Sequence, residues 1–107
     1  MAKDQTNGNL DLLLLRVLSR GPAHGYAVIN TLKETSRGMF DLPEGTVYPS
    51  LHRLERSGLL ASDWDSSSGR RRRVYAITTR GQEGLASGRR EWKTFAAEMN
   101  AVLGVQA

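Results

Sequence analysis

The chain has 107 residues, of which 39% are hydrophobic and 24% are charged. This length suits one compact domain with a single core, and the composition excludes disordered and low-complexity classes. The sequence has no cysteine, which excludes disulfide scaffolds, thiolate nucleophiles and cysteine-ligated metal centres. No apolar run approaches the roughly 20 residues of a membrane span, and residues 1–9 lack a signal-peptide pattern, so we expect a cytoplasmic protein with no membrane partner.

The net charge is modest but unevenly distributed. Fifteen basic and eleven acidic residues give +4, and the stretch from Arg53 to Arg73 contains six arginines and three acidic residues. Such a concentrated basic cluster favours a polyanion as partner over a small neutral substrate.

Two helices are predicted in the first third of the chain. Residues 10–18 hold seven apolar side chains in nine positions and are followed by Gly21, which predicts a first helix. Leu12 and Leu15 point away from the main apolar face of this helix, which predicts a second surface for a partner chain or a ligand. A shorter second helix is expected over residues 23–36.

The stretch from Pro43 to Ser57 predicts a third helix, whose buried stripe consists of Val47, Leu51 and Leu54. The opposite face carries Gly45, Pro49, His52 and Arg56, flanked by Thr46, Tyr48 and Arg53. Such side chains can donate to phosphates and base edges or touch a thymine methyl, although a merely solvated helix face is the alternative. Pro49 removes one backbone hydrogen bond, so a later start or a bend of the helix is also open.

Beyond Gly58 the apolar period changes from helical to alternating. Side chains of two kinds alternate along residues 60–64 and again along residues 74–78, with a turn-forming run between the two segments. This pattern predicts a two-stranded hairpin packed on the helices. Arg70, Arg71, Arg72 and Arg73 follow that turn. Alternation would direct two of them to a phosphate backbone or minor groove and two to water, and solvation alone is the alternative.

A last helix is expected from Thr79, because Thr79 and Gln82 have the spacing of a capping box. Its apolar residues form a seam that consists of Leu85, Trp92, Phe95, Met99 and Val102. Three helices followed by a hairpin with a basic tip is the order of a winged helix, a helix-turn-helix variant whose third helix enters the DNA major groove. The expected fold class is therefore mainly α with a small β-hairpin.

Residues suited to catalysis or metal binding are scarce. Ser50 and His52 lie about 200° apart around a helix and cannot face each other. The sequence has two histidines, His24 and His52, too few and too separated for a metal site. We therefore expect no enzyme, no metal and no cofactor.

Several short motifs stand together across about residues 10 to 85, and the block from Gly45 to Glu55 is the most specific of them. The motifs are Leu12–Leu18, Pro22–Tyr26, Glu44–Glu55, Gly58–Leu60, Gly69–Arg71, Tyr75, Ile77–Thr78 and Gly81. As a set they resemble the PadR family of bacterial transcription regulators. The resemblance also accounts for the proline inside the third helix.

The resemblance implies a homodimeric winged helix-turn-helix repressor that binds a palindromic operator on double-stranded DNA. Residues 1–78 would form the DNA-binding domain and residues 79–107 a C-terminal dimerisation helix. The implied interface residues are Leu85, Phe95, Met99 and Val102. Base reading would fall to Thr46, Tyr48, His52 and Arg53, with Tyr26 as an extra phosphate contact.

The same resemblance implies release of DNA by a small aromatic or phenolic effector at the dimer centre. Trp92 lies where a ligand-sandwiching tryptophan would fall, and Leu12 and Leu15 point to the same region. The alternative is that Trp92 only packs the dimer.

Two other functions stay open from the sequence alone. A winged helix can act as a protein-interaction module that offers its basic wing to an acidic partner without operator specificity. A ligand carrier or promiscuous catalyst with an apolar dimer pocket is the weakest hypothesis, because no catalytic constellation is present.

Overall fold

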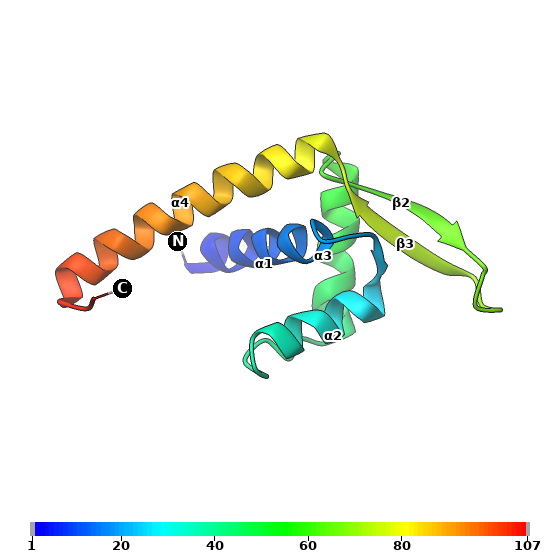
Figure 1. The fold of residues 1–107 in the computed structure, drawn as a ribbon, viewed down its shortest axis with the longest axis horizontal. Coiled ribbons are helices and arrows are strands. Elements are labelled where there is room, and N and C mark those ends of the chain that lie inside the picture. Colours follow the sequence, from blue (N-terminus) through cyan, green and yellow to red (C-terminus); the bar gives the residue numbers. More distant parts are fainter. Residues whose placement is uncertain (1, 107) are drawn as a thin grey trace.

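The computed structural model describes the backbone of residues 2–106 and the side chains of residues 9–106. Over this range the chain forms four helices and three short strands (Figure 1). Their order is α1 (Ala2–Leu18), β1 (Ala23–His24), α2 (Gly25–Thr35), α3 (Glu44–Arg56), β2 (Leu60–Asp65), β3 (Arg72–Ile77) and α4 (Thr79–Leu103). The predicted winged helix-turn-helix is confirmed, with the β2–β3 hairpin as its wing.

The first helix begins earlier than predicted, whereas the last begins at Thr79 as predicted but with another capping residue. α1 starts at Ala2 rather than at Leu10. The N-cap of α4 is Thr78, whose Oγ accepts a hydrogen bond from the Gly81 amide at 3.0 Å. The predicted capping box that starts at Thr79 is therefore wrong by one residue. Thr78 takes the role because its hydroxyl also donates to the Gly58 carbonyl at 2.7 Å, which fixes it at the end of the wing.

The sheet has a third strand that the sequence pattern did not reveal. β1 pairs antiparallel with β3, with Ala23 opposite Tyr75 and His24 opposite Val74, so the strand order is β1-β3-β2. The expected helix over residues 23–36 is corrected accordingly, since α2 begins only at Gly25. A two-residue strand is too short to show a period in the sequence.

The core lies between the first three helices and the sheet. Its largest fully buried side chains are Leu14, Leu18, Val28, Val47, Leu51, Leu60 and Tyr75. The predicted α3 stripe is confirmed, since Leu54 is buried together with Val47 and Leu51. The prediction that Leu15 points to an outer surface is wrong, because α4 covers that side of α1 and leaves Leu15 only 4% exposed.

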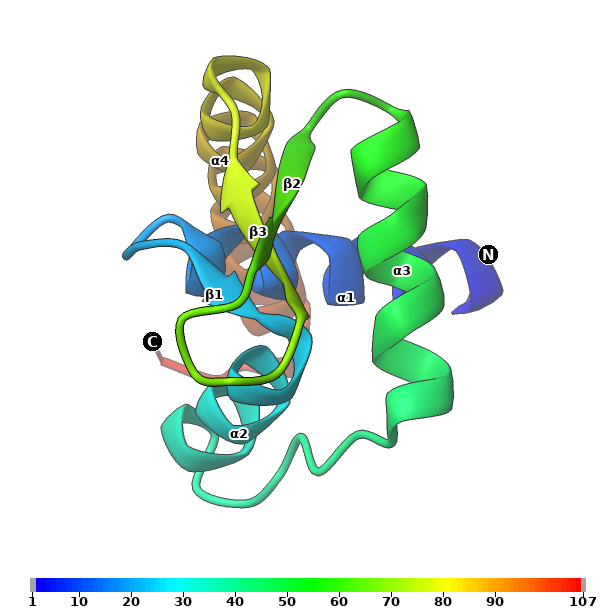
Figure 2. The same cartoon turned by 90° about the vertical axis from the view of Figure 1, so that its right-hand side faces the viewer.

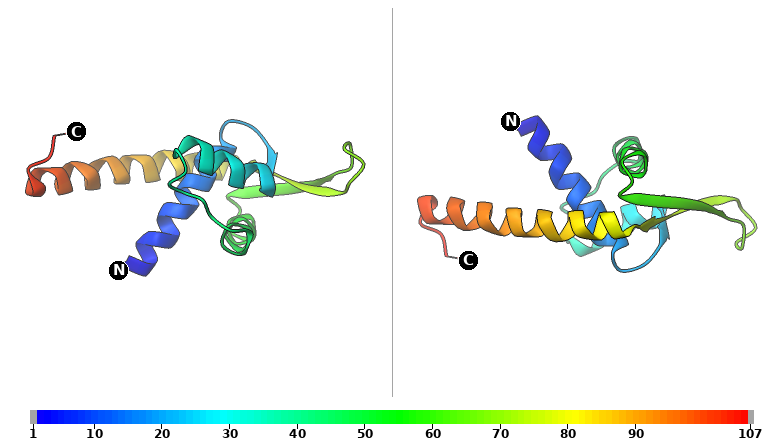
Figure 3. Two further views of the ribbon diagram at one scale, coloured as in Figure 1. Left: turned by 90° about the horizontal axis from the view of Figure 1, so that it is seen from below. Right: turned by 90° about the horizontal axis from the view of Figure 1, so that it is seen from above.

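α4 packs on this body near its start, where glycines permit close approach. A Cβ on Gly81 would lie 2.1 Å from the carbonyl oxygen of Leu59, and one on Gly88 would lie 2.6 Å from Cδ1 of Leu12. The C-terminal part of α4 projects from the body (Figures 1 and 3), and the molecule measures 53 × 29 × 24 Å. None of the helices in the described range combines the length and apolar character needed to cross a bilayer.

We expect Gly81→Ala to lower the free energy of unfolding by about 2–3 kcal/mol, because the new Cβ overlaps a backbone carbonyl that has no room to move. Gly84→Ala is the matched control on the same helix. Its Cβ would meet the Leu59 side chain at an ordinary 3.8 Å, so it should gain about 1 kcal/mol from helix propensity. Urea unfolding at one protein concentration measures both changes, and equal midpoints for the two variants would contradict the packing at Leu59.

Candidate nucleic-acid interface

α3, the wing and the start of α2 gather at the end of the molecule that faces the viewer in Figure 2. The predicted outer face of α3 is exposed at Gly45, Pro49, His52 and Arg56, and so is the flanking Thr46. Tyr48 and Arg53 are partly buried at its edges, and Glu44 at the helix start adds one exposed acidic group. The exposed face is therefore mostly polar or basic. The buried stripe on the opposite side of α3 determines which face of the helix is exposed.

Pro49 lies inside a continuous α3, which excludes the alternative of a later helix start. Proline at this position lacks the amide that would bond to the carbonyl of Gly45, and its ring crowds that carbonyl. Gly45 lies in open space, where even an added Cβ would meet nothing within 4 Å. Pro49 occupies an early turn of α3 and presents an exposed apolar ring on the outer face.

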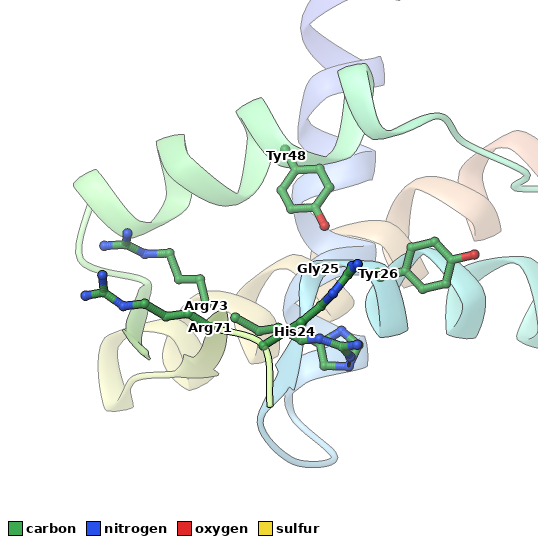
Figure 4. A pocket seen from close by; sticks show the side chains of 8 residues that line it. His24, Gly25, Tyr26, Tyr48, Arg71 and Arg73 are labelled. Atoms are coloured by element: carbon green, nitrogen blue, oxygen red, sulfur yellow. Dashed lines mark hydrogen bonds between the residues drawn. The ribbon is translucent and has the colours of Figure 1, made fainter. Parts of the chain in front are cut away.

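An open pocket of about 470 Å³ lies between the wing and the start of α2; we call it the basic pocket. Its lining consists of His24, Gly25, Tyr26, Tyr48 and the four arginines 70–73 (Figure 4). His24 caps α2, because its Nδ1 accepts a hydrogen bond from the Ala27 amide at 3.3 Å. A pocket lined by four arginine residues and by the N-terminus of α2 favours the binding of an anion.

Tyr48 is positioned in the basic pocket by a glycine that sequence reasoning did not single out. The phenol ring lies so close to Gly25 that a Cβ there would come within 2.5 Å of it. Figure 4 shows Tyr48 pointing from α3 toward Gly25 at the start of α2. Burial, with a smaller effect from Glu44, raises the pKa of Tyr48, so its hydroxyl keeps its proton and can donate to a phosphate oxygen at neutral pH.

The wing arginines have different partners, and the predicted strand alternation is limited to Arg72 and Arg73, because β3 begins only at Arg72. Arg71 and Arg73 both stack on the indole of Trp64, with their guanidinium carbons 4.3 and 4.9 Å from the ring centroid. Arg72 instead places Nη1 3.2 Å from Nε2 of His24. Figure 4 shows the guanidinium groups of Arg71 and Arg73 extending in the same direction, away from Tyr26.

Arg73 is also tied to the body of the protein. Its Nε donates to Oγ of Ser62 at 2.7 Å, and its Nη2 lies 3.9 Å from Oε2 of Glu55 on α3. The Ser62 hydroxyl in turn donates to the same Glu55 oxygen at 2.5 Å. The positive charge of Arg73 is thus partly balanced within the chain.

The wing turn is shaped by Asp65, whose carboxylate accepts hydrogen bonds from the backbone amide and the hydroxyl of Ser67 at 3.0 and 3.1 Å. These two bonds hold the pKa of Asp65 below its ordinary value, so it stays ionised at neutral pH. The backbone closes at Gly69, which adopts a φ of +83°. The register places Asp65 opposite Arg72, so Arg70 and Arg71 lie in the connecting loop and Arg72 and Arg73 in β3.

Arg53 has a partner that the sequence analysis overlooked. Its Nη2 forms an ion pair and hydrogen bond with Oδ1 of Asp11 on α1. Burial raises the pKa of Asp11, and the neighbouring Arg53 opposes that rise. The predicted base reader therefore has its guanidinium directed to α1. An aspartate inside the leucine-rich segment of α1 was the signal that could have revealed this partner.

The residues predicted for an effector and for a dimer interface are divided between surface and core. Leu12 and Trp92 line an apolar recess of about 230 Å³, together with Asn9, Leu13 and Phe40; we call it the apolar recess. Leu15 is absent from this lining, because it belongs to the core. Leu85 is also buried, whereas the other seam residues are exposed, namely Phe95, Met99 and Val102.

Among the side chains of residues 9–106, no cluster of three or more histidine and acidic groups is arranged to hold a metal ion.

The sequence of residues 14–87 matches the PadR-like family of transcriptional regulators. The chain belongs to this family. Its curated relatives include the transcriptional regulator Rv3488 of Mycobacterium tuberculosis, which is 44% identical over 75 residues, or 70% of this chain and 67% of the relative. The transcriptional regulator YqjI of Escherichia coli is 28% identical over 85 residues, which cover 79% of this chain and 40% of that protein.

Solved structures of PadR family regulators are similar along nearly the whole chain. The regulator from Eggerthella lenta shares 31% identity at a TM-score of 0.82, with 99% of this chain and 91% of that chain covered. The regulator from Clostridium difficile R20291 shares 32% identity at a TM-score of 0.76, with coverages of 88% and 97%. The protein is thus a winged-helix transcriptional regulator of a DNA-binding family, and the resemblance seen in its motifs is confirmed.

The Asp11–Arg53 pair predicts a stability difference that depends on pH. Because the pKa of Asp11 is raised, the wild type loses stability as pH rises from the ordinary value of 3.8 through the raised value. Asp11→Asn removes this titration, so the variant should gain stability relative to the wild type across that window. Urea unfolding of both proteins between about pH 3 and about pH 7 measures the difference, and a constant difference would contradict the prediction.

Arg53→Gln is the matched comparison for that experiment. It leaves a half-buried carboxylate without its cation, so it should cost more stability at neutral pH than at acid pH. Adding Asp11→Asn to this variant should restore stability at neutral pH. Additive effects of the two substitutions would show that the pair is not coupled.

Proposed function

We propose that this PadR-family regulator is a homodimeric repressor that binds a palindromic operator and is released by a small aromatic molecule. The observation that carries the DNA-binding part is the basic pocket, where the start of α2, a tyrosine of α3 and the wing arginines converge. A row of adjacent arginines repels itself unless an anion neutralises it, and a duplex offers phosphates at regular spacing.

Each element of this end has a role in the proposal. α3 enters the major groove and presents Thr46, His52 and Arg56 to base edges, with the Pro49 ring as an apolar contact. Phosphates are held by the tyrosine hydroxyls and by the loop side of the wing, through Tyr26, Tyr48, Arg70, Arg71 and Arg72. Arg53, which the sequence analysis assigned to base reading, instead fixes α3 to α1 through Asp11.

Dimerisation through the projecting part of α4 is the second element of the proposal. Residues 1–78 serve as the DNA-binding domain and residues 79–107 as the dimerisation helix. Phe95, Met99 and Val102 are 40%, 44% and 89% exposed on a projecting helix, an arrangement that a second copy would cover. A two-fold dimer would place its two α3 helices in half-sites one helical turn, or a multiple of it, apart.

The apolar recess supports the effector part of the proposal. Trp92 is half-exposed above Leu12 and Leu13, and its ring lies 5.8 Å from that of Phe95. A flat aromatic ligand fits such a lining, and in a dimer the recess would lie near the partner chain. Phe40 belongs to the loop that leads into α3, so an occupied recess would act directly on the recognition helix.

DNA binding should depend steeply on salt. Three arginines per chain, Arg70 to Arg72, neutralise about six phosphates per dimer, so the logarithm of affinity should fall with the logarithm of salt at a slope of about −5. Fluorescence anisotropy on a labelled duplex from immediately upstream of the gene, with a shuffled duplex as competitor, measures slope and specificity. Equal competition by the shuffled duplex would favour a protein-interaction module instead.

Two charge-matched triple variants sharpen that experiment. Changing Arg70, Arg71 and Arg72 to Gln should flatten the slope to near zero and weaken binding by at least about a hundredfold. Changing Arg89, Arg90 and Lys93 of α4 to Gln removes the same charge and should leave most of the affinity. Equal losses would indicate an effect of net charge rather than of the basic pocket.

Effector binding should be visible in the fluorescence of Trp92. The chain has two tryptophans, so Trp64→Phe isolates Trp92 and Trp92→Phe isolates Trp64. Titration with apolar aromatic dyes and phenolic acids should quench the first variant saturably and the second little. Leu12→Gln should weaken the quenching because it places a polar group in the recess. If no compound quenches the fluorescence, Trp92 is a dimer-packing residue instead.

A further inference from the structure

Trp64 is a large aromatic residue on the outside of the wing that nothing in the core requires. Its indole is 48% exposed on β2, directly across the ladder from Arg73. Two arginines of the run lie over its ring at 4.3 and 4.9 Å. An exposed indole in contact with two cations is a cation–π arrangement, and it restricts the side chains that it contacts.

The two arginines on this indole differ in what else holds them. Arg73 lies in β3 and is bound through Ser62 and Glu55 to α3. Arg71 lies just beyond the last ladder pair, Asp65 with Arg72, so strand pairing does not set its direction. Trp64 is the contact that connects the held arginine to the one in the loop.

We propose that Trp64 is a positioning residue for DNA binding, which holds Arg71 at a set place relative to the recognition helix through Arg73, Ser62 and Glu55. The proposal rests on the proposed function of the wing as a phosphate grip. The connection runs from Glu55 on α3 through the sheet to the loop, so it relates the two elements that must meet one duplex together. An arginine ordered before binding loses less side-chain freedom when it meets a phosphate.

A double-mutant cycle separates this role from a direct contact between the indole and DNA. Trp64→Leu should weaken binding to the upstream duplex by about three- to tenfold, and Trp64→Phe should keep most of the affinity because it retains an aromatic face. In an Arg71→Gln background, Trp64→Leu should cost little more. The same loss in both backgrounds would overturn the proposal in favour of an indole that inserts into DNA, and no loss in either would overturn it altogether.

Glu55→Gln supplies a test in which simple electrostatics predicts the opposite sign. Removing a negative charge near a DNA-binding surface should raise affinity if only Coulomb attraction acts. If Glu55 acts by holding Arg73, affinity should fall by about two- to threefold, because the connection to Trp64 is loosened. A rise in affinity would overturn the part of the proposal that involves Glu55.

NMR of the DNA-free protein tests the geometry apart from the function. The side-chain protons of Arg71 and Arg73 should be shifted upfield by the ring current of Trp64, and the shift should vanish in Trp64→Leu and persist in Trp64→Phe. Unshifted arginine protons in the wild type would overturn the stacking itself. If the shifts are present but the Arg70–Arg72 triple variant binds DNA as well as the wild type, the proposed function of the wing fails while the stack stands.

Discussion

The structure depends on one close contact, in which the carbonyl of Leu59 packs against both the end of the wing and the start of α4. The Thr78 amide donates to this oxygen at 3.1 Å and so continues the ladder beyond its last strand pair, Leu60 with Ile77. The same oxygen lies where any side chain at Gly81 would have to go. Because the wing ends and α4 begins at this one contact, it directs the basic wing to one end of the molecule and the apolar stripe of α4 to the other.

The arginines of the basic end fall into two groups with different physical roles. Arg53 and Arg73 have acidic partners within the chain, Asp11 and Glu55, on elements far from them in sequence. Such pairs fix the orientation of α3 relative to α1 and to the sheet. The loop side of the wing keeps its positive charge at the basic pocket, and a repulsive cluster of this kind gains most from an external polyanion. In this protein, Arg53 and Arg73 therefore hold the interface in shape, whereas the arginines of the wing loop are those that we propose contact DNA.

Much of the fold could be predicted because the governing signals are local. The stripe of Val47, Leu51 and Leu54, the change of period after Gly58 and the turn before the arginine run each depend on residues close in sequence. The same holds for the outer face of α3, where four positions were placed correctly by helical geometry alone. Pro49 was the exception, since local physics disfavours a proline inside a helix, and α3 nevertheless runs through it without a break.

By itself the sequence determined the kinds and order of the elements, the buried stripe of α3, the position of the basic cluster and the family. Only the tertiary structure decided that Leu15 and Leu85 are core residues, that Thr78 rather than Thr79 caps α4, and that two residues before α2 join the sheet. It also decided that Arg53 pairs with Asp11, 42 positions away, and that Trp64 lies beneath two arginines. The physical reason is that periodicity reports which side of an element is buried, whereas the neighbour that covers it or balances its charge comes from a distant part of the chain.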